Sequence, residues 1–353
     1  MDLYVLNRDL EPQAVISSFR ALEWLRKAYE PGTFQVTFEY SEEMANILQI
    51  GYLLWNTDTD EPGIITKMQK EASDRGEESI IIKGYMAGRY LNQRIVNARE
   101  IISDTPQNIM RALVDSHAVD PTDPDRAIPN LYLGTDTATN DDSIDYQTEY
   151  VNLAKAISDL AAAHEIGWKI RLDPVEKKLY FDTWTGTDRT ITSEQPCLFS
   201  PEFGTILSQR YYNDLGNYAT FCVMAAGKDD DRITQDCGSG EGLDRYEIYA
   251  NASGITTKDQ TEEQIREQLK AAGAEKLAKY PMTEGFESKI NFANASEFDL
   301  GDYVTCENKR WNVRKDYQIK AIRRNIRNGK DETTVTFGDE VQTLTSLIKA
   351  KES

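Results

Sequence analysis

Apolar and polar residues alternate in short runs near both ends of the chain, a pattern that predicts antiparallel strands with one buried face. The N-terminal runs cover residues 34–38, 50–55, 63–68 and 79–84, and the C-terminal runs cover 285–290, 300–304, 319–322 and 334–338. In each series an apolar residue and a glycine, Gly51 or Gly301, introduce the second run. The matching order predicts two copies of one small β-module, and two unrelated meanders remain the alternative.

Helical patterns lie mainly in the rest of the chain. Residues 145–165 carry an apolar stripe that Gly167 ends, which predicts an amphipathic helix, and a hairpin over 168–184 follows. Further helices are expected at 41–48, from residue 103 with Pro106 in the first turn, and at 261–280. For residues 15–30 both helix and strand fit the pattern.

These elements indicate an α+β protein that is mainly antiparallel β, with two similar β-modules at the chain ends and an α+β middle region. The 353-residue length allows several cores. The predicted divisions are a first β-module at 1–98, a middle domain at 99–194, a mixed region at 195–280, a second β-module at 281–340 and a C-terminal helix at 341–353.

The net charge of the chain argues against nucleic-acid binding. The chain holds 40 Lys and Arg residues against 59 Asp and Glu residues, a net charge of −19, whereas phosphate binding needs a basic surface. Positive charge does gather near the C-terminus, and this basic strand comprises Arg310, Arg314, Lys315, Arg323, Arg324 and Arg327. It is interpreted as a solvated face or an intersubunit salt-bridge surface, with a nucleic-acid site less favoured.

Candidate chemistry is sparse. Two histidines make a triad or a histidine-rich metal site improbable, and residues 229–231 lack the pattern of a calcium loop. Glycines at 238–242 lack the Lys-Ser/Thr of a phosphate loop. We therefore expect no enzyme, no catalytic residue, no cofactor and no metal.

The sequence gives no sign of a disulfide framework, of secretion or of membrane insertion. Four scattered cysteines predict free buried thiols. The sequence shows neither a signal peptide nor an apolar stretch of roughly twenty residues, so synthesis in a cytoplasm and no membrane insertion are expected.

Several phrases together resemble a known family, namely residues 18–36, 81–96, 167–174 (GWKIRLDP), 185–190, 199–206 and 299–305 (DLGDYVT). In this order, and over nearly the whole chain, they are similar to the ReqiPepy-type siphophage tail proteins. The resemblance implies a baseplate-hub-like virion protein at the tail tip. It implies a homotrimeric ring in which the two tube-like β-barrel modules of each chain give six similar units. It also implies contacts with the distal tail protein, the tape-measure protein and receptor-binding or fibre proteins. Phage DNA would cross the acidic lumen without specific binding.

The interface hypothesis follows from the repeat and the charge. Gly51, Gly301 and Asp302 are expected to set the turns of the two modules, and the basic strand is expected to face an acidic neighbour. Two other functions stay open: a cell-wall hydrolase built on the middle region, and a carbohydrate-binding tail-tip protein that uses an exposed tryptophan such as Trp184.

Overall fold

A computed structural model describes residues 1–74, 76–216, 218–227, 232–252, 255, 260–278, 280–292 and 297–339. The acidic run at 229–231 and the predicted C-terminal helix at 341–353 lie outside these residues. The chain folds as two units, the first formed by Met1–Arg210 with Glu287–Gly338 and the second by Tyr211–Phe286 with Asp339–Ser353. The chain passes into the second unit within one strand and returns within another.

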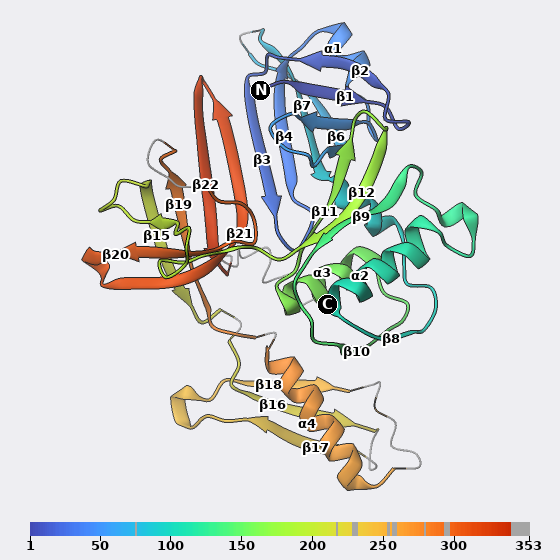
Figure 1. Ribbon diagram of the computed structural model, residues 1–353, viewed down its shortest axis with the longest axis vertical. Coiled ribbons are helices and arrows are strands. Elements are labelled where there is room, and N and C mark those ends of the chain that lie inside the picture. Colours follow the sequence, from blue (N-terminus) through green and yellow to red (C-terminus); the bar gives the residue numbers. More distant parts are fainter. Residues whose placement is uncertain are drawn as a thin grey trace. The chain divides into compact units, whose positions relative to one another are not determined.

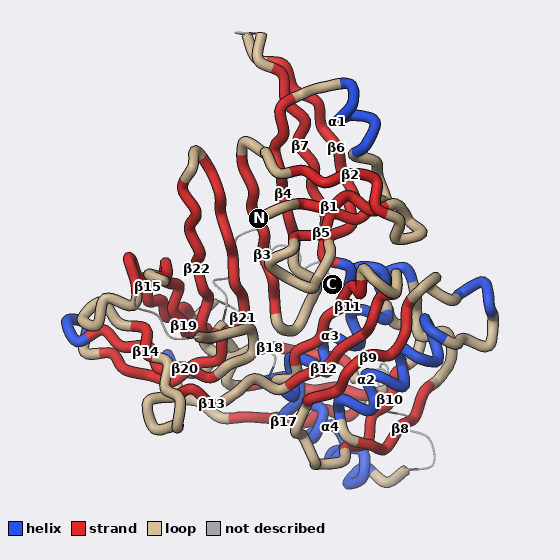
Figure 2. The backbone as a smooth tube through the Cα atoms, turned by 45° about the horizontal axis from the view of Figure 1, so that its top comes forward, coloured by secondary structure: helices blue, strands red, loops and turns tan. Residues whose placement is uncertain are grey.

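A fourteen-stranded sheet organises the first unit, and Figure 2 shows its strands β22, β21, β3 and β4 side by side. Its main path runs in the order β15-β19-β22-β21-β3-β4-β7-β6-β5-β1-β2, with β20 beside β21 and with β13 and β14 beside β20. The strands of the N-terminal module are β1 (Leu3–Leu6), β2 (Pro12–Ile16), β3 (Ala21–Lys27), β4 (Thr33–Glu39), β5 (Leu53–Asn56), β6 (Gly63–Ala72) and β7 (Glu78–Met86). Those of the C-terminal module are β13 (Asp188–Arg189), β14 (Leu198–Phe199), β15 (Ile206–Asp214), β19 (Thr283–Ile290), β20 (Tyr303–Asn308), β21 (Val313–Arg327) and β22 (Lys330–Gly338).

The predicted mainly antiparallel character is confirmed, but the predicted barrels are not found. Along the described strands the sheet remains open, from β15 at one edge to β2 at the other. Within the N-terminal module, β3 pairs with β4 on one side and with β21 on the other. Because the second edge of β3 is paired with β21, β3 cannot also pair with a strand of its own module to close a barrel.

The N-terminal module contains a tight glycine turn before β5. Gly51 has a φ of +87°, a region that glycine enters at no steric cost. Its N–H donates to the carbonyl of Ile65 at 2.8 Å, and the N–H of Ile65 donates back to the carbonyl of Tyr52 at 2.8 Å. The register of β6 then shifts between Ile65 and Lys67, which marks a bulge.

The C-terminal module repeats these interactions in the same order. Gly301 has a φ of +90°, its N–H donates to Ile319 at 2.8 Å, and Ile319 donates back to Asp302 at 2.8 Å. A register shift in β21 again follows, between Ile319 and Ala321. Position for position, β5, β6 and β7 therefore correspond to β20, β21 and β22, so the phrases that match in sequence occupy corresponding strands.

For residues 15–30 the pattern left helix and strand open, and the structure shows strands: residues 15–16 end β2, and residues 21–27 form β3. The side chains of β3 and β4 show why: Leu22, Trp24, Phe34, Val36 and Phe38 alternate with more exposed positions and are buried. They form one apolar core with β1 and β7. Burial of one face at a period of two overrides the partial helical pattern.

The middle region packs α2 (Pro106–Val114) and α3 (Leu153–His164) against a three-stranded sheet, as Figure 1 shows. That sheet has the order β11-β12-β9, and β8 and β10 form a separate pair. The remaining bounds are α1 (Glu42–Ile47), β8 (Glu100–Asp104), β9 (Leu131–Thr137), β10 (Ile144–Thr148), β11 (Gly167–Asp173) and β12 (Lys178–Trp184), with short helical turns η1 (Ala87–Gln93), η2 (Asp115–Val119), η3 (Pro124–Arg126) and η6 (Lys309–Trp311).

Two predictions for the middle region can be compared directly with these elements. The hairpin over 168–184 is confirmed as β11 and β12. The helix expected at 145–165 begins only at Leu153, because residues 144–148 form β10 and pair with β8. Asn152 caps α3 by accepting a hydrogen bond from the N–H of Lys155 at 3.1 Å.

The second unit is a small α+β body. Its sheet has the order β17-β16-β18, and α4 packs on it. The bounds are β16 (Phe221–Ala226), β17 (Ile233–Gly238), η5 (Gly242–Asp244), β18 (Glu247–Asn251) and α4 (Glu262–Ala278). Gly273 lets the helix approach the sheet, since a Cβ there would lie 2.2 Å from the sulfur of Cys237.

Candidate assembly site at the joint between the two modules

The N-terminal and C-terminal modules meet where β3 pairs with β21. Seven consecutive residues of each strand are paired, from Ala21 opposite Arg327 to Lys27 opposite Ala321. Trp24 lies in the middle of β3, is 2% exposed and stacks on Phe34 at 5.3 Å. We call this pairing and the loops beside it the joint. It makes one continuous sheet from two modules.

A charged cluster, in which Glu61 is buried and Asp299 is exposed, fixes the joint at one end. The guanidinium of Arg26 donates to the carboxylate of Asp299 at 3.1 Å, and its Nε lies 3.8 Å from Glu61 Oε2. Arg26 comes from β3, Glu61 from the loop between β5 and β6, and Asp299 from the turn before β20. The cluster therefore ties the N-terminal module to the glycine turn of the C-terminal module.

The same cluster reaches the middle region. Lys169 of β11 contacts Asp60 at 2.6 Å, and the N–H of Leu172 donates to the carbonyl of Asp60 at 2.8 Å. Glu61 is only 3% exposed, and burial raises its pKa from 4.5 to about 7, although Arg26 and Lys169 oppose that shift. Burial thus moves the titration of this carboxyl toward neutral pH.

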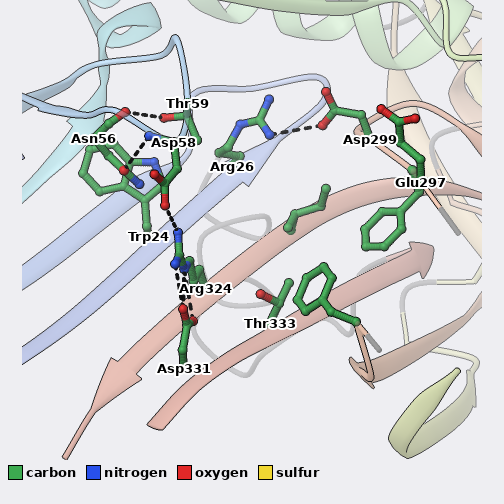
Figure 3. Close-up of a pocket in the computed structure, with 13 residues that line it drawn as sticks. Trp24, Arg26, Asn56, Asp58, Thr59, Glu297, Asp299, Arg324, Asp331 and Thr333 are labelled. Carbon is green, nitrogen blue, oxygen red and sulfur yellow. Dashed lines mark hydrogen bonds and ion pairs between the residues drawn. The ribbon is translucent and has the colours of Figure 1, made fainter. Parts of the chain in front are cut away.

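Arg324 holds the other side of the joint. It donates to Asp331 of β22 at 2.6 Å and to Asp58 of the loop after β5. These two carboxylates raise the pKa of the Arg324 guanidinium. Figure 3 shows these contacts beside a cleft of about 750 Å³. The cleft combines apolar Trp24, Phe298 and Ile322 with the charged groups at its rim.

The glycine turn of the C-terminal module is also fixed by its neighbours. Asp302 is 6% exposed and accepts hydrogen bonds from the N–H of Thr187 at 2.8 Å and from Arg189 Nε at 2.9 Å. A Cβ added at Gly186 would lie 1.9 Å from the carbonyl oxygen of Gly301. The turn thus lies against the segment that leaves the middle region.

The structure brings together some of the predicted interface residues and separates others. Gly301, Asp302 and Arg324 lie at or beside the joint, whereas Gly51 lies in the corresponding turn of the other module, against Arg8. Exposed side chains of the basic strand are those of Arg310, Arg314, Lys315 and Arg327, and Arg323 lies 3.9 Å from Glu23 within the same chain. That this strand faces an acidic neighbour stays a prediction.

Sequence reasoning missed the cluster of Arg26, Glu61 and Asp299. These residues are far apart in the chain, and nothing in the repeat predicts that their side chains lie close together. A partial signal existed, because Asp299 comes directly before the apolar-Gly pair that recurs in both modules.

Other candidate chemistry gains no support from the geometry. Within the described ranges no group of three or more His, Cys, Asp or Glu side chains could hold a metal ion. The indole N–H of Trp184 donates to the carbonyl of Leu300 at 3.0 Å, and Lys169 lies over its ring at 5.6 Å. All four cysteines are free and buried, as predicted. No helix among the described residues is long and apolar enough to span a membrane.

Solved structures of tail proteins share this fold. Two solved structures share the fold over 96% of this chain: a tail protein from Neisseria meningitidis MC58 (TM-score 0.59, 10% identity, 96% of its own chain) and the 43 kDa tail protein of prophage MuSo2 from Shewanella oneidensis (TM-score 0.58, 8% identity, 98% of its own chain). The chain belongs to the Siphovirus ReqiPepy6 Gp37-like protein family, whose model matches residues 2–339. No curated protein matches the sequence.

Proposed function

We propose that this protein is the hub at the tip of a siphophage tail, a homotrimer that continues the tail tube and links it to the distal parts. One observation carries the proposal: each chain contains two modules with the same turn, bulge and strand register, joined side by side in one sheet. Three such chains supply six similar modules. A trimer could therefore meet a sixfold ring on one side and threefold partners on the other.

The charge of the chain supports a passage for DNA through such a ring. With a net charge of −19, the protein repels a polyanion instead of binding it. DNA would slide past without a specific contact. The partners we propose are the distal tail protein, the tape-measure protein and receptor-binding or fibre proteins.

The role that we propose is structural, with no catalytic step. The charged groups of the joint are engaged with one another: Arg26 with Asp299, Lys169 with Asp60, and Arg324 with Asp58 and Asp331. Such networks fix the relative position of packed elements. They are well suited to a rigid ring component.

The solution mass of the purified chain tests the proposal. Light scattering over a range of concentrations is expected to approach three times 40.1 kDa. A chain that remains a monomer at the highest concentration would contradict a self-assembling hub. Zymography on host cell walls serves as the control for function, and cleared zones would favour a hydrolase.

A further inference from the structure

A second cavity, of about 330 Å³, lies between the N-terminal module and the middle region. The turn between β1 and β2, the glycine turn before β5, η1 and the loop after η3 all contribute to its walls. Its charged lining residues are Arg8 and Arg94, and no Asp or Glu of the described part of the chain lines it. In a chain with a net charge of −19, this cavity therefore stands out by carrying positive charge alone.

The backbone of the turn between β1 and β2 positions Arg8. Asn7 Oδ1 accepts hydrogen bonds from two backbone N–H groups of this turn, each at 2.9 Å, which fixes its shape. The guanidinium of Arg8 lies against Gly51, where an added Cβ would be 2.5 Å from Arg8 Nη2. Within the described ranges Arg8 has no ion-pair partner, because Glu11 of the same turn pairs with Lys177 at 2.7 Å. The charge of Arg8 is thus available to a ligand.

Backbone carbonyls, and not carboxylates, hold Arg94 in place. Its Nε donates to the carbonyl of Arg126, its Nη1 to that of Gln93 at 3.1 Å and its Nη2 to that of Ala127 at 3.4 Å. Burial and the neighbouring Arg126 lower the pKa of the Arg94 guanidinium. Since carbonyl groups carry no net charge, these bonds orient Arg94 without neutralising it. A partly buried charge is normally paired, and neither Arg94 nor Arg126 has an ion-pair partner among the described residues.

The rest of the lining combines a hydroxyl donor with an apolar wall. Burial raises the pKa of Tyr90 to about 12, although Arg8 opposes this shift, so the hydroxyl keeps its proton at neutral pH. The apolar wall includes Leu10, Ile64 and Ile128, which are 3%, 5% and 6% exposed. A largely apolar wall with a few convergent polar groups is typical of sites for small molecules. The arrangement suits an anion that also has an apolar part.

We propose that this cavity binds a small organic anion, a carboxylate or a phosphate monoester, whose charged head pairs with Arg8 and Arg94. The apolar body of the ligand would contact Leu10, Ile64 and Ile128. A guanidinium presents parallel N–H donors that match two oxygens of a carboxylate or a phosphate. The inference goes beyond the proposed function, because binding at this cavity does not require the chain to assemble.

Isothermal titration calorimetry of the full chain with hexanoate, hexyl phosphate and the neutral hexanol tests the site. Arg8→Gln is expected to weaken binding of the tighter anion by roughly tenfold or more, because a charge-assisted hydrogen bond is lost. Arg8→Lys keeps the charge without the paired donors, so its affinity should be intermediate. The matched control is Arg20→Gln, which removes a positive charge outside the cavity, where Arg20 lies 3.7 Å from Glu39, and it should bind like wild type. Equal thermal midpoints without ligand would establish that the variants fold.

Each outcome decides for or against the site. Binding of either anion that Arg8→Gln weakens and Arg20→Gln does not would support it, and the tighter anion would identify the head group. Equal affinity of wild type and Arg8→Gln would overturn the proposal, as would the absence of binding at millimolar concentrations. Hexanol that binds as tightly as hexanoate would also overturn it, since the charge would then play no part. Light scattering tests the hub separately, so either proposal can fail alone.

Discussion

Substituting the buried Glu61 by glutamine is expected to change how the stability of this protein depends on pH. The carboxyl of Glu61 is 3% exposed, and its neighbours are Arg26, Lys169, Asp60 and Asp299. Burial raises its pKa in the folded protein from 4.5 to about 7. Between these two values the folded state holds a proton that the unfolded state has released.

The sign of the effect follows from this difference. Stability that comes from the protonated carboxyl is fully present below pH 4.5 and is lost as the pH rises through about 7. A shift of this size corresponds to at most about 3 kcal/mol of unfolding free energy. The glutamine variant lacks this titration, so its stability relative to wild type should rise by up to that amount between pH 5 and pH 8.

Urea unfolding at several pH values between 5 and 8 measures the difference. Glu71→Gln, at the exposed end of β6, is the control for loss of a carboxylate elsewhere in the sheet. Wild type and Glu61→Gln curves that run parallel across this range would refute the reasoning. They would mean that Arg26 keeps Glu61 ionised in spite of its burial.

Three further substitutions test the joint by denaturant unfolding. Gly301→Ala is expected to cost about 1–2 kcal/mol because its φ of +90° disfavours a side chain, and an unchanged midpoint would contradict the strained turn. Arg324→Ala should cost about 1–3 kcal/mol because two carboxylates lose their partner, whereas the exposed Arg327→Ala should stay within about 0.5 kcal/mol; equal costs would remove Arg324 from the joint. Asp302→Asn should cost about 1–3 kcal/mol, since the charged hydrogen bond from Arg189 is weakened, and Asp302→Asn as stable as wild type would count against that bond.

The repeat could be predicted because it rests on local patterns. Alternating apolar residues select strands, and Gly51 and Gly301 mark turns that need a positive φ, so four runs at each end were enough to match the modules. The hairpin at 168–184 was predictable for the same reason. The start of α3 was predicted too early: the apolar stripe begins only at Tyr150, and residues 144–148 alternate and pair with β8.

The site depended on tertiary structure. The charged cluster forms only because the outer edge of β3 is paired with β21, which brings together Arg26, Glu61 and Asp299. No local sequence pattern determines which strand edge is paired. The same pairing keeps the modules from closing as the predicted barrels. The sequence by itself therefore determined the strands, the turns and the family. The tertiary structure decided which strand edges are paired, which charges are buried and which edge of each module stays open. The reason is that hydrogen bonding between strands depends on contacts between distant parts of the chain.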